Sequence, residues 1–466
     1  MVLVGLCLLF CHNTWSIRAE EPDVPLVNPR MVGEIMVSGN YRTHRSVIVA
    51  ELLFHEGELI EMNDLPDLIE RSRENIQNTS LFNIVEIDWS FPDINTVNFF
   101  IVVEERWYIW AFPLFEAEGR NFADFLRTND GSNFNYGLYL KHDNFRGRHE
   151  LLKLRFITGY RTQAILDYQN PAINHKSGWG AKVVWYMFDE MAYQTVDDKQ
   201  VFIKQSGDQL LREMSFHLSY SYRHHHDFHH QIMLSYFDVV AADTLLALNP
   251  GYLPGGNTTS RTLEFAYNYE FDRRDSKVYP LNGLYAQLVF ARRGMVVDSI
   301  SDWTGFFQSE LLLSWQKQLL YRWYAKSDLK ISLIDKSDVP YFYQSGLGYH
   351  EYLNGFEYRV IDGTTYGALK NKLIFELVPR RDVVWKRMPI KQFSRIHYAL
   401  YLKLNLDVGY VINNNELDNN YLANSVLFGY GPGIDLVTIY DQVWGFNYSF
   451  NNFGGQGFFL HFNLVL

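Results

Sequence analysis

Over most of the chain, hydrophobic and polar residues alternate one by one. The segments "REMSFHLSYSYR", "RTLEFAYNYEFD" and "HYALYLKLNLDV" show the pattern clearly. Successive side chains of a strand point to opposite faces, so this alternation predicts strands with one apolar face. Each run lasts about ten residues, which is the length of a tilted membrane strand.

These strands predict a closed barrel in a membrane. After the N-terminus, no apolar run approaches the ~18 residues of a membrane helix, and lipid tolerates only helices or closed barrels. The alternative is a soluble β-sandwich or a lipocalin-like barrel, whose strands average about 5–6 residues. The long runs and the aromatic content of 16% favour the membrane barrel, with Tyr and Trp at the two interfaces.

The segment from Val32 to Glu105 follows another pattern and predicts a small α+β domain. Its expected order is strand, helix, helix, strand, strand. One face of "TVNFFIVVEE" is apolar and can pack on the helices. Its residues are Val97, Phe99, Ile101 and Val103.

The apolar run "VLVGLCLLF" precedes small and polar residues and then an acidic stretch, "EEPDVP". This pattern predicts a secretory signal peptide over residues 1–19, cleaved near Ala19. Both cysteines, Cys7 and Cys11, fall within it. A lipid anchor on Cys11 is the alternative, but a bulky Phe10 precedes that cysteine, so we favour simple cleavage. The mature chain would then hold no thiol and no disulfide.

No motif predicts an enzyme. The sequence shows no nucleophile elbow, phosphate-binding loop or metal-ligand spacing, so we predict no catalytic residue and no cofactor. The histidines between His224 and His230 could bind a metal, but strand alternation would separate neighbours, which favours a short periplasmic turn. The carboxylates of "DRRD", Asp272 to Asp275, could form a catalytic pair, but "YPLNG" follows soon after, which favours a strand end and turn. The net charge of −11 argues against a nucleic-acid partner.

The α+β domain resembles a POTRA (polypeptide-transport-associated) domain. The segments "VSGNYRTHRSVIVAELLFHEGE", "LPDLIERSRENIQNTSLFNIVEI" and "NFFIVVEE" carry this resemblance. A generic α+β module with the same order of elements is the alternative.

The barrel segments resemble the outer-membrane protein assembly family, that is the BamA/TamA type, also called bacterial surface antigens. The resemblance rests on "HDNFRGRHELLKLRFITG", "YQNPAI", "DRRDSKVYPLNGLYAQL", "LNGFEYRVIDG" and "NYSFNNFGGQGFFLHFNLVL". The segments "RWYIWAFPLFE" and "EYRVIDG" most resemble short members from the Bacteroidetes.

The resemblance implies one POTRA domain over residues 32–105 and a transmembrane barrel of sixteen antiparallel strands over residues 107–466. It implies a place in the bacterial outer membrane, with the POTRA domain in the periplasm. The implied function is insertion or translocation of proteins, without nucleotide. The implied partners are client outer-membrane or secreted proteins, subunits of an envelope complex and the lipid bilayer. The POTRA domain would hold a client segment along an edge strand, for which we expect "LFNIVEIDW".

A single POTRA domain departs from the assembly factors of the family, which carry several. This departure leaves room for a specialised accessory. The alternative function is therefore a pore or a structural partner in an outer-membrane complex that inserts no client.

Pro113 falls in the expected first barrel strand, "WYIWAFPLFEAEG". Proline cannot donate to a strand ladder and belongs at edges. The resemblance implies a seam between the first and last strands that opens and templates a client strand, where Pro113 would remove one hydrogen bond. The alternative is that Pro113 lies at the rim of the barrel and matters little.

The loop "LNGFEYRVIDG", Leu353–Gly363, departs from the family pattern. The resemblance aligns Asn354, Gly355 and Phe356 with an Arg-Gly-aromatic motif whose arginine meets acidic groups on the inner barrel wall. Strand alternation places two acids on that wall. We hypothesise that Arg359 supplies the charge that Asn354 lacks; the alternative is that Arg359 faces water and the loop is held less tightly. The two wall acids are Glu376 and Asp407.

Overall fold

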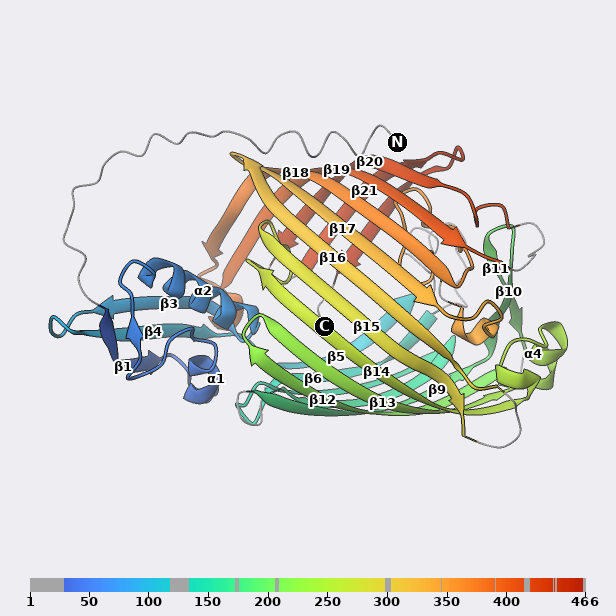
Figure 1. The fold of residues 1–466 in the computed structure, drawn as a ribbon, viewed down its shortest axis with the longest axis horizontal. Helices are drawn as coiled ribbons and strands as arrows, with labels where there is room; N and C mark the ends of the chain where they lie inside the picture. Colours follow the sequence, from blue (N-terminus) through green and yellow to red (C-terminus); the bar gives the residue numbers. More distant parts are fainter. Residues whose placement is uncertain are drawn as a thin grey trace.

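The computed structural model describes residues 29–117, 134–171, 176–205, 209–297, 303–344, 346–389, 391–414, 420–438, 440 and 442–463. They form an α+β domain followed by a large antiparallel sheet that curls into a barrel (Figure 1). The predicted signal peptide lies outside the described residues. Within the described part of the chain, no helix is both long and apolar enough to span a membrane.

The N-terminal domain packs two helices on a four-stranded sheet of order β2-β1-β4-β3. The central pair, β1 and β4, is parallel, and the outer pairs are antiparallel. The order of elements differs from the predicted one by the short strand β2 between the two helices: β1 (Arg30–Ser38), α1 (Arg45–Val49), β2 (Leu59–Ile60), α2 (Leu65–Asn78), β3 (Phe82–Ser90) and β4 (Thr96–Glu105).

The apolar face of β4 forms the centre of this domain. Phe99 is fully buried and its ring stacks on Phe54, with ring centroids 4.0 Å apart. Helix α2 covers the same face through Leu65 and Ile76. Among the described residues, strand β3 pairs with β4 on one side only, so its other side is an edge of the sheet.

The described part of the barrel has sixteen strands, as predicted, and every pair of neighbours is antiparallel. Along the chain they are β5 (Ile109–Ala117), β6 (Phe134–Phe145), β7 (Glu150–Gly159), β8 (Arg161–Asn170), β9 (Ser177–Phe188), β12 (Leu211–His225), β13 (Phe228–Ala241), β14 (Thr259–Arg274), β15 (Gly283–Val296), β16 (Phe306–Leu320), β17 (Trp323–Ile334), β18 (Thr365–Val384), β19 (Arg395–Ile412), β20 (Leu427–Thr438), β21 (Gln442–Asn451) and β22 (Gln456–Asn463).

The two faces of the barrel wall differ in polarity, as the alternation predicted. On β19 the residues Leu402, Leu404 and Leu406 are 38–53% exposed on the outer face. Their neighbours Asn405 and Asp407 are at most 1% exposed and face the lumen. The outer surface therefore carries an apolar belt and the lumen carries polar groups.

The two ends of the barrel are distinct (Figure 1). The N-terminal domain lies at one end, here called the proximal end, together with the β12–β13, β16–β17 and β18–β19 turns. The opposite, distal end carries the hairpin of β10 (Glu190–Val196) and β11 (Lys199–Lys204) and the short helix α4 (Asp243–Leu248).

Candidate functional site

The loop between β17 and β18 folds back and seats its tip on the inner barrel wall. Leu353 and Phe356 are 1% and 3% exposed and join a cluster with Val411 of β19. Gly355 has φ +83°, and a Cβ there would lie 2.6 Å from the carbonyl oxygen of Phe450 on β21. A Cβ on Gly429 of β20 would overlap the carbonyl oxygen of Asn354. The loop and wall backbones thus touch at two points, and at each point one of the two residues is a glycine.

Asn354 bonds directly to the wall acid Asp407. Its backbone N–H and its side-chain Nδ2 donate to Asp407 Oδ2 over 2.9 and 2.6 Å. Its Oδ1 accepts from Asn447 Nδ2 over 3.2 Å and from Ser449 Oγ over 3.4 Å, both on β21. A neutral amide therefore links the loop to two strands at a buried position.

Arg359 does not take over the missing charge. Its guanidinium donates to the carbonyl oxygen of Asp197, in the β10–β11 turn, over 2.9 Å. Among the described residues it bonds neither Glu376 nor Asp407, so the structure corrects the hypothesis that Arg359 compensates for Asn354. The reason is local: the adjacent Val360 N–H donates to the Asp198 carbonyl oxygen over 2.9 Å, which places Arg359 at the distal hairpin.

Glu376 lies on the lumen face but apart from the loop anchor. On β18 it pairs with Tyr401, whereas Lys370 pairs with Asp407 further along the same ladder. Its backbone N–H donates to the carbonyl oxygen of Arg322 in the β16–β17 turn, at the proximal end. Of the two predicted wall acids, the structure brings only Asp407 to the loop.

Glu351 is an anchor that sequence reasoning missed. It forms ion pairs with Lys370 of β18 and with Lys330 of β17, the latter at 3.5 Å. Here the loop supplies the acid and the wall supplies the cations, the reverse of the expected polarity. The lumen-facing parity of Lys370 was the available signal.

The loop also binds the last strand, β22. The ring of Tyr352 stacks on His461 with centroids 5.0 Å apart, and its hydroxyl lies 2.8 Å from His461 Nδ1. Glu357 Oε1 lies 3.8 Å from His461 Nε2. Tyr358 packs on Phe459, with ring centroids 5.1 Å apart. The loop therefore connects the interior wall to one edge of the sheet.

The two edges of the sixteen-stranded sheet are β5 and β22. Within the described residues, β5 pairs only with β6 and β22 only with β21. Pro113 lies in β5 opposite Leu138 of β6, inside the strand and not beyond its end. Near the start of β5, Trp110 packs on Tyr440 of the β20–β21 turn, with ring centroids 5.0 Å apart. The two edges thus belong to one side of the barrel, and no ladder joins them among the residues that the structure describes.

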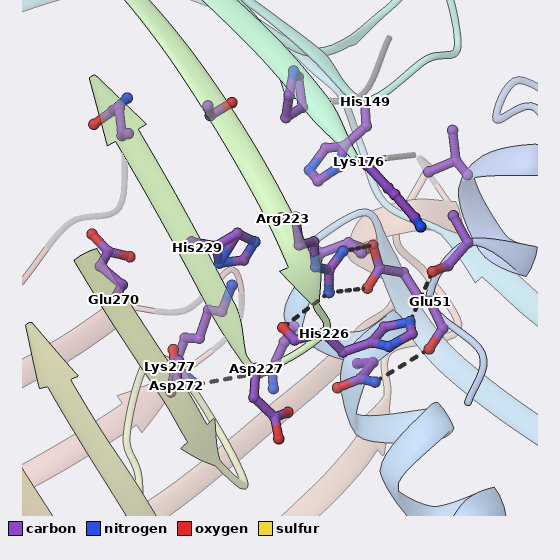
Figure 2. Close-up of a pocket in the computed structure, with 18 of the residues that line it drawn as sticks. Glu51, His149, Lys176, Arg223, His226, Asp227, His229, Glu270, Asp272 and Lys277 are labelled. Atoms are coloured by element: carbon purple, nitrogen blue, oxygen red, sulfur yellow. Dashed lines mark hydrogen bonds and ion pairs between the residues drawn. The ribbon is translucent and has the colours of Figure 1, made fainter. Parts of the chain in front are cut away.

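A second site lies between the N-terminal domain and the proximal end (Figure 2). Glu51, just after α1, faces Arg223 of β12, and both oxygens of the carboxylate accept from the guanidinium over 2.7 Å. Arg71 of α2 pairs with Asp227 at 3.2 Å. His226 Nε2 lies 2.9 Å from the carbonyl oxygen of Ala50. The expected histidine-rich turn is thus one docking point of the N-terminal domain on the barrel.

A cavity of about 840 Å³ opens beside these contacts. Burial alone would raise the pKa of Glu51, but the charge and hydrogen bonds of Arg223 outweigh it and hold that pKa below its ordinary value. Burial and the nearby Arg223 lower the pKa of His226. Burial and Lys277 lower the pKa of His149, although Glu51 opposes them. The junction therefore favours an ionised carboxylate with neutral imidazoles.

The other candidate motifs form local structure. Asp272 pairs with Arg274 at 2.7 Å, and the Asp275 carboxylate accepts backbone N–H groups of Ser276, Leu281 and Asn282. These contacts shape the turn after β14, as the sequence favoured. In the part of the chain that the structure describes, no three His, Cys, Asp or Glu side chains are grouped as a metal site.

Residues 31–106 match the POTRA family model, described as surface antigen variable number repeat. No curated protein matches the sequence.

Several solved structures share the fold. BamA from Haemophilus ducreyi lacking POTRA domains 1–3 aligns with 13% identity over 93% of this chain and 84% of its own, with a TM-score of 0.52. CdiB from Escherichia coli aligns with 12% identity over 93% of this chain and 75% of its own, with a TM-score of 0.57. CdiB from Acinetobacter baumannii aligns with 12% identity over 93% and 73%, with a TM-score of 0.53. The resemblance to the BamA type is thereby confirmed in its fold, a POTRA domain followed by a sixteen-stranded barrel.

Proposed function

We propose that this chain, a POTRA domain joined to a BamA-type barrel, inserts or translocates proteins at the bacterial outer membrane. The barrel would span that membrane with the POTRA domain in the periplasm. The observation that carries the proposal is the seam: β5 and β22 are both strand edges without a ladder between them in the described residues. Unpaired backbone N–H and C=O groups at such edges can accept a client strand.

The loop contacts support a seam that can open and close by movement of β22. Tyr352, Glu357 and Tyr358 contact β22, whereas Asn354 and Glu351 contact the interior wall. A movement of β22 must therefore break or carry along loop contacts that the other strands do not share. Contacts of this kind would couple the position of the loop inside the lumen to the position of β22 at the edge of the sheet.

The POTRA domain would receive the client first. Strand β3 is an edge of its sheet and spans most of the segment "LFNIVEIDW". Asn83 of β3 donates to the carbonyl oxygen of Gln392 in the β18–β19 turn over 3.1 Å. A client strand added to β3 would thus lie beside the proximal end of the barrel, from which it could pass to the seam.

The proposal is tested by depleting this chain in cells and measuring which proteins the outer membrane loses. General loss of outer-membrane barrels from the envelope supports insertion or translocation by this chain. Loss of a single cargo, or an intact envelope proteome, overturns the general role and supports the second function, a structural partner in an outer-membrane complex. The control is complementation by the wild-type chain, which must restore the normal set of outer-membrane proteins.

A further inference from the structure

The hairpin of β18 and β19 extends past its neighbour at the proximal end. Strand β17 stops pairing with β18 at Phe375, whereas β18 and β19 continue to pair as far as Val384 opposite Arg395. Two bulges interrupt β18 between Glu376 and Arg381, and Pro379 lies in the second. Bulges and a proline on the free side are features of an exposed strand edge.

The end of this hairpin is strongly basic. Arg380, Arg381, Lys386 and Arg387 are all exposed, and the intervening acid is Asp382 alone. Within the described chain none of these four cations has an ion-pair partner, unlike Arg71 and Arg223 at the same end of the barrel. Four exposed cations within eight residues create a positive local potential that attracts anionic partners.

The same tip is also apolar. Val383, Val384 and Trp385 are 48%, 52% and 50% exposed. A soluble turn would bury or omit such side chains, whereas a tryptophan flanked by cations is typical of a membrane interface.

The tip continues the outer belt of the barrel. Even-numbered residues of β19 face outward, as the exposed Leu402 and Leu404 show. The ladder pairs Arg381 with Tyr398 and Val383 with Ile396, which are even-numbered positions. Arg381 and Val383 therefore lie on the outward side, in line with the apolar belt.

We propose that the tip, residues 380–387, is a docking surface for anionic phospholipids of the periplasmic leaflet. Val383 and Trp385 would lie among the acyl-chain ends, and the cations of the tip would contact headgroup phosphates. The docking would hold the membrane against the β18–β19 side of the proximal end. The contact of Gln392 with Asn83 would then fix the POTRA edge strand relative to the bilayer surface. This inference rests on the proposed place of the barrel in the outer membrane, but it does not depend on the proposed transport of clients.

The test uses the full chain without residues 1–19, reconstituted in vesicles, with Val383→Cys on the outward side supplying its only thiol. A fluorophore on this introduced thiol reports quenching by brominated phosphatidylglycerol or by brominated phosphatidylcholine at equal amounts. We expect phosphatidylglycerol to quench more strongly, and salt to reduce the difference. Replacing Arg381, Lys386 and Arg387 by Gln should reduce the preference by about fivefold per neutralised charge at low ionic strength.

The matched control carries Arg148→Gln, Arg273→Gln and Lys277→Gln, three exposed cations that line the POTRA–barrel cavity. It should keep the lipid preference. Equal quenching by the two lipids, or equal loss in both triple variants, overturns the proposal. Two soluble anions, added as competitors of the lipid, show whether the tip prefers a lipid headgroup, free phosphate or an acidic protein. Inorganic phosphate should leave the preference intact, and abolition of the preference by a polyglutamate peptide would instead identify an acidic protein as the partner and also overturn it.

Discussion

Asn354 donates to a single carboxylate oxygen of Asp407 from both its backbone and its side chain. This anchor of the loop is therefore a neutral amide on a buried acid. Its strength depends on geometry, because the loop backbone must lie against the wall for both donors to reach one oxygen.

The first prediction compares Asn354→Ala with Arg359→Ala. Removing the Asn354 amide leaves Asp407 with one donor fewer at a fully buried site, which costs about 1–3 kcal/mol. Removing Arg359 deletes a partly exposed bond to the distal hairpin, worth about 1 kcal/mol or less. Hydrogen exchange at residues 353–357 should rise markedly in Asn354→Ala and little in Arg359→Ala. The reverse order would mean that the hairpin, and not Asp407, holds the loop.

The second prediction concerns the ion pair between Glu51 and Arg223. Their side chains are 11% and 23% exposed, so either single change to Gln leaves a buried charge without its partner. We expect a loss of about 3–5 kcal/mol in docking for each single variant and a strong coupling in the double variant. Protease sensitivity of the POTRA–barrel junction measures this loss. The control pair, Arg45 and Glu56, is about half exposed and should contribute less than about 1 kcal/mol.

The third prediction is a pH dependence of the same junction. His149 and His226 have lowered pKa values when docked, so the released state binds more protons below about pH 6.5. Docking should therefore weaken as the pH falls from about 7.5 to about 6. Burial and the nearby Glu70 raise the pKa of Glu74 to about 6, which opposes the trend below that pH.

Replacing both histidines by Gln should flatten this dependence, as read from protease cleavage at the junction across the same pH range. The Glu51 carboxylate stays ionised throughout this range, because its pKa lies below its ordinary value. If the pH dependence of docking keeps its slope in the variant without the two histidines, other groups are responsible for that dependence.

The fourth prediction concerns the seam. A cysteine replacing Ala111 of β5 should form a disulfide with a cysteine replacing Phe458 or Leu460 of β22 when oxidant is added, because closure brings the two edges within disulfide reach. Cells that depend on the chain should lose fitness in oxidant and recover in reductant. A lock that forms in full and leaves growth unchanged would show that the seam need not open.

The fifth prediction concerns orientation. Protease added to intact cells should spare residues 32–105, because the POTRA domain would lie in the periplasm. Its apolar face packs on its own helices and not on lipid, so the domain should stay folded after osmotic release. Cleavage within it on intact cells would reverse the topology.

The fold could be predicted because its patterns are local. The alternation on β19 sets the two faces of the wall, and the apolar face of β4 requires helices to cover it. The position of Asp407 followed from strand parity for the same reason. The partner of Asp407 could not be predicted in the same way, because the position of the loop depends on close contacts between its backbone and the wall. These contacts are made by Gly355 against β21 and by Gly429 against Asn354.

The role of Arg359 could not be predicted because it depends on a hairpin that the sequence did not place. The β10–β11 turn lies 162 residues away along the chain, and only the folded barrel brings Asp197 within reach. The same holds for the histidine-rich turn. The sequence indicated a turn, but the contact of Arg223 beside it with Glu51 depends on where the N-terminal domain packs against the barrel. Long-range partners of polar side chains are not encoded in local periodicity.

The loop contacts also order events in time. The partners of Asn354 at Asp407 and Asn447 follow it by 53 and 93 residues, and His461 follows Tyr352 by 109. During synthesis and threading, the loop emerges before the strands that carry Asp407, Asn447 and His461. It can reach its full set of partners only after the final strand has arrived, so a seated loop records that the barrel has been completed.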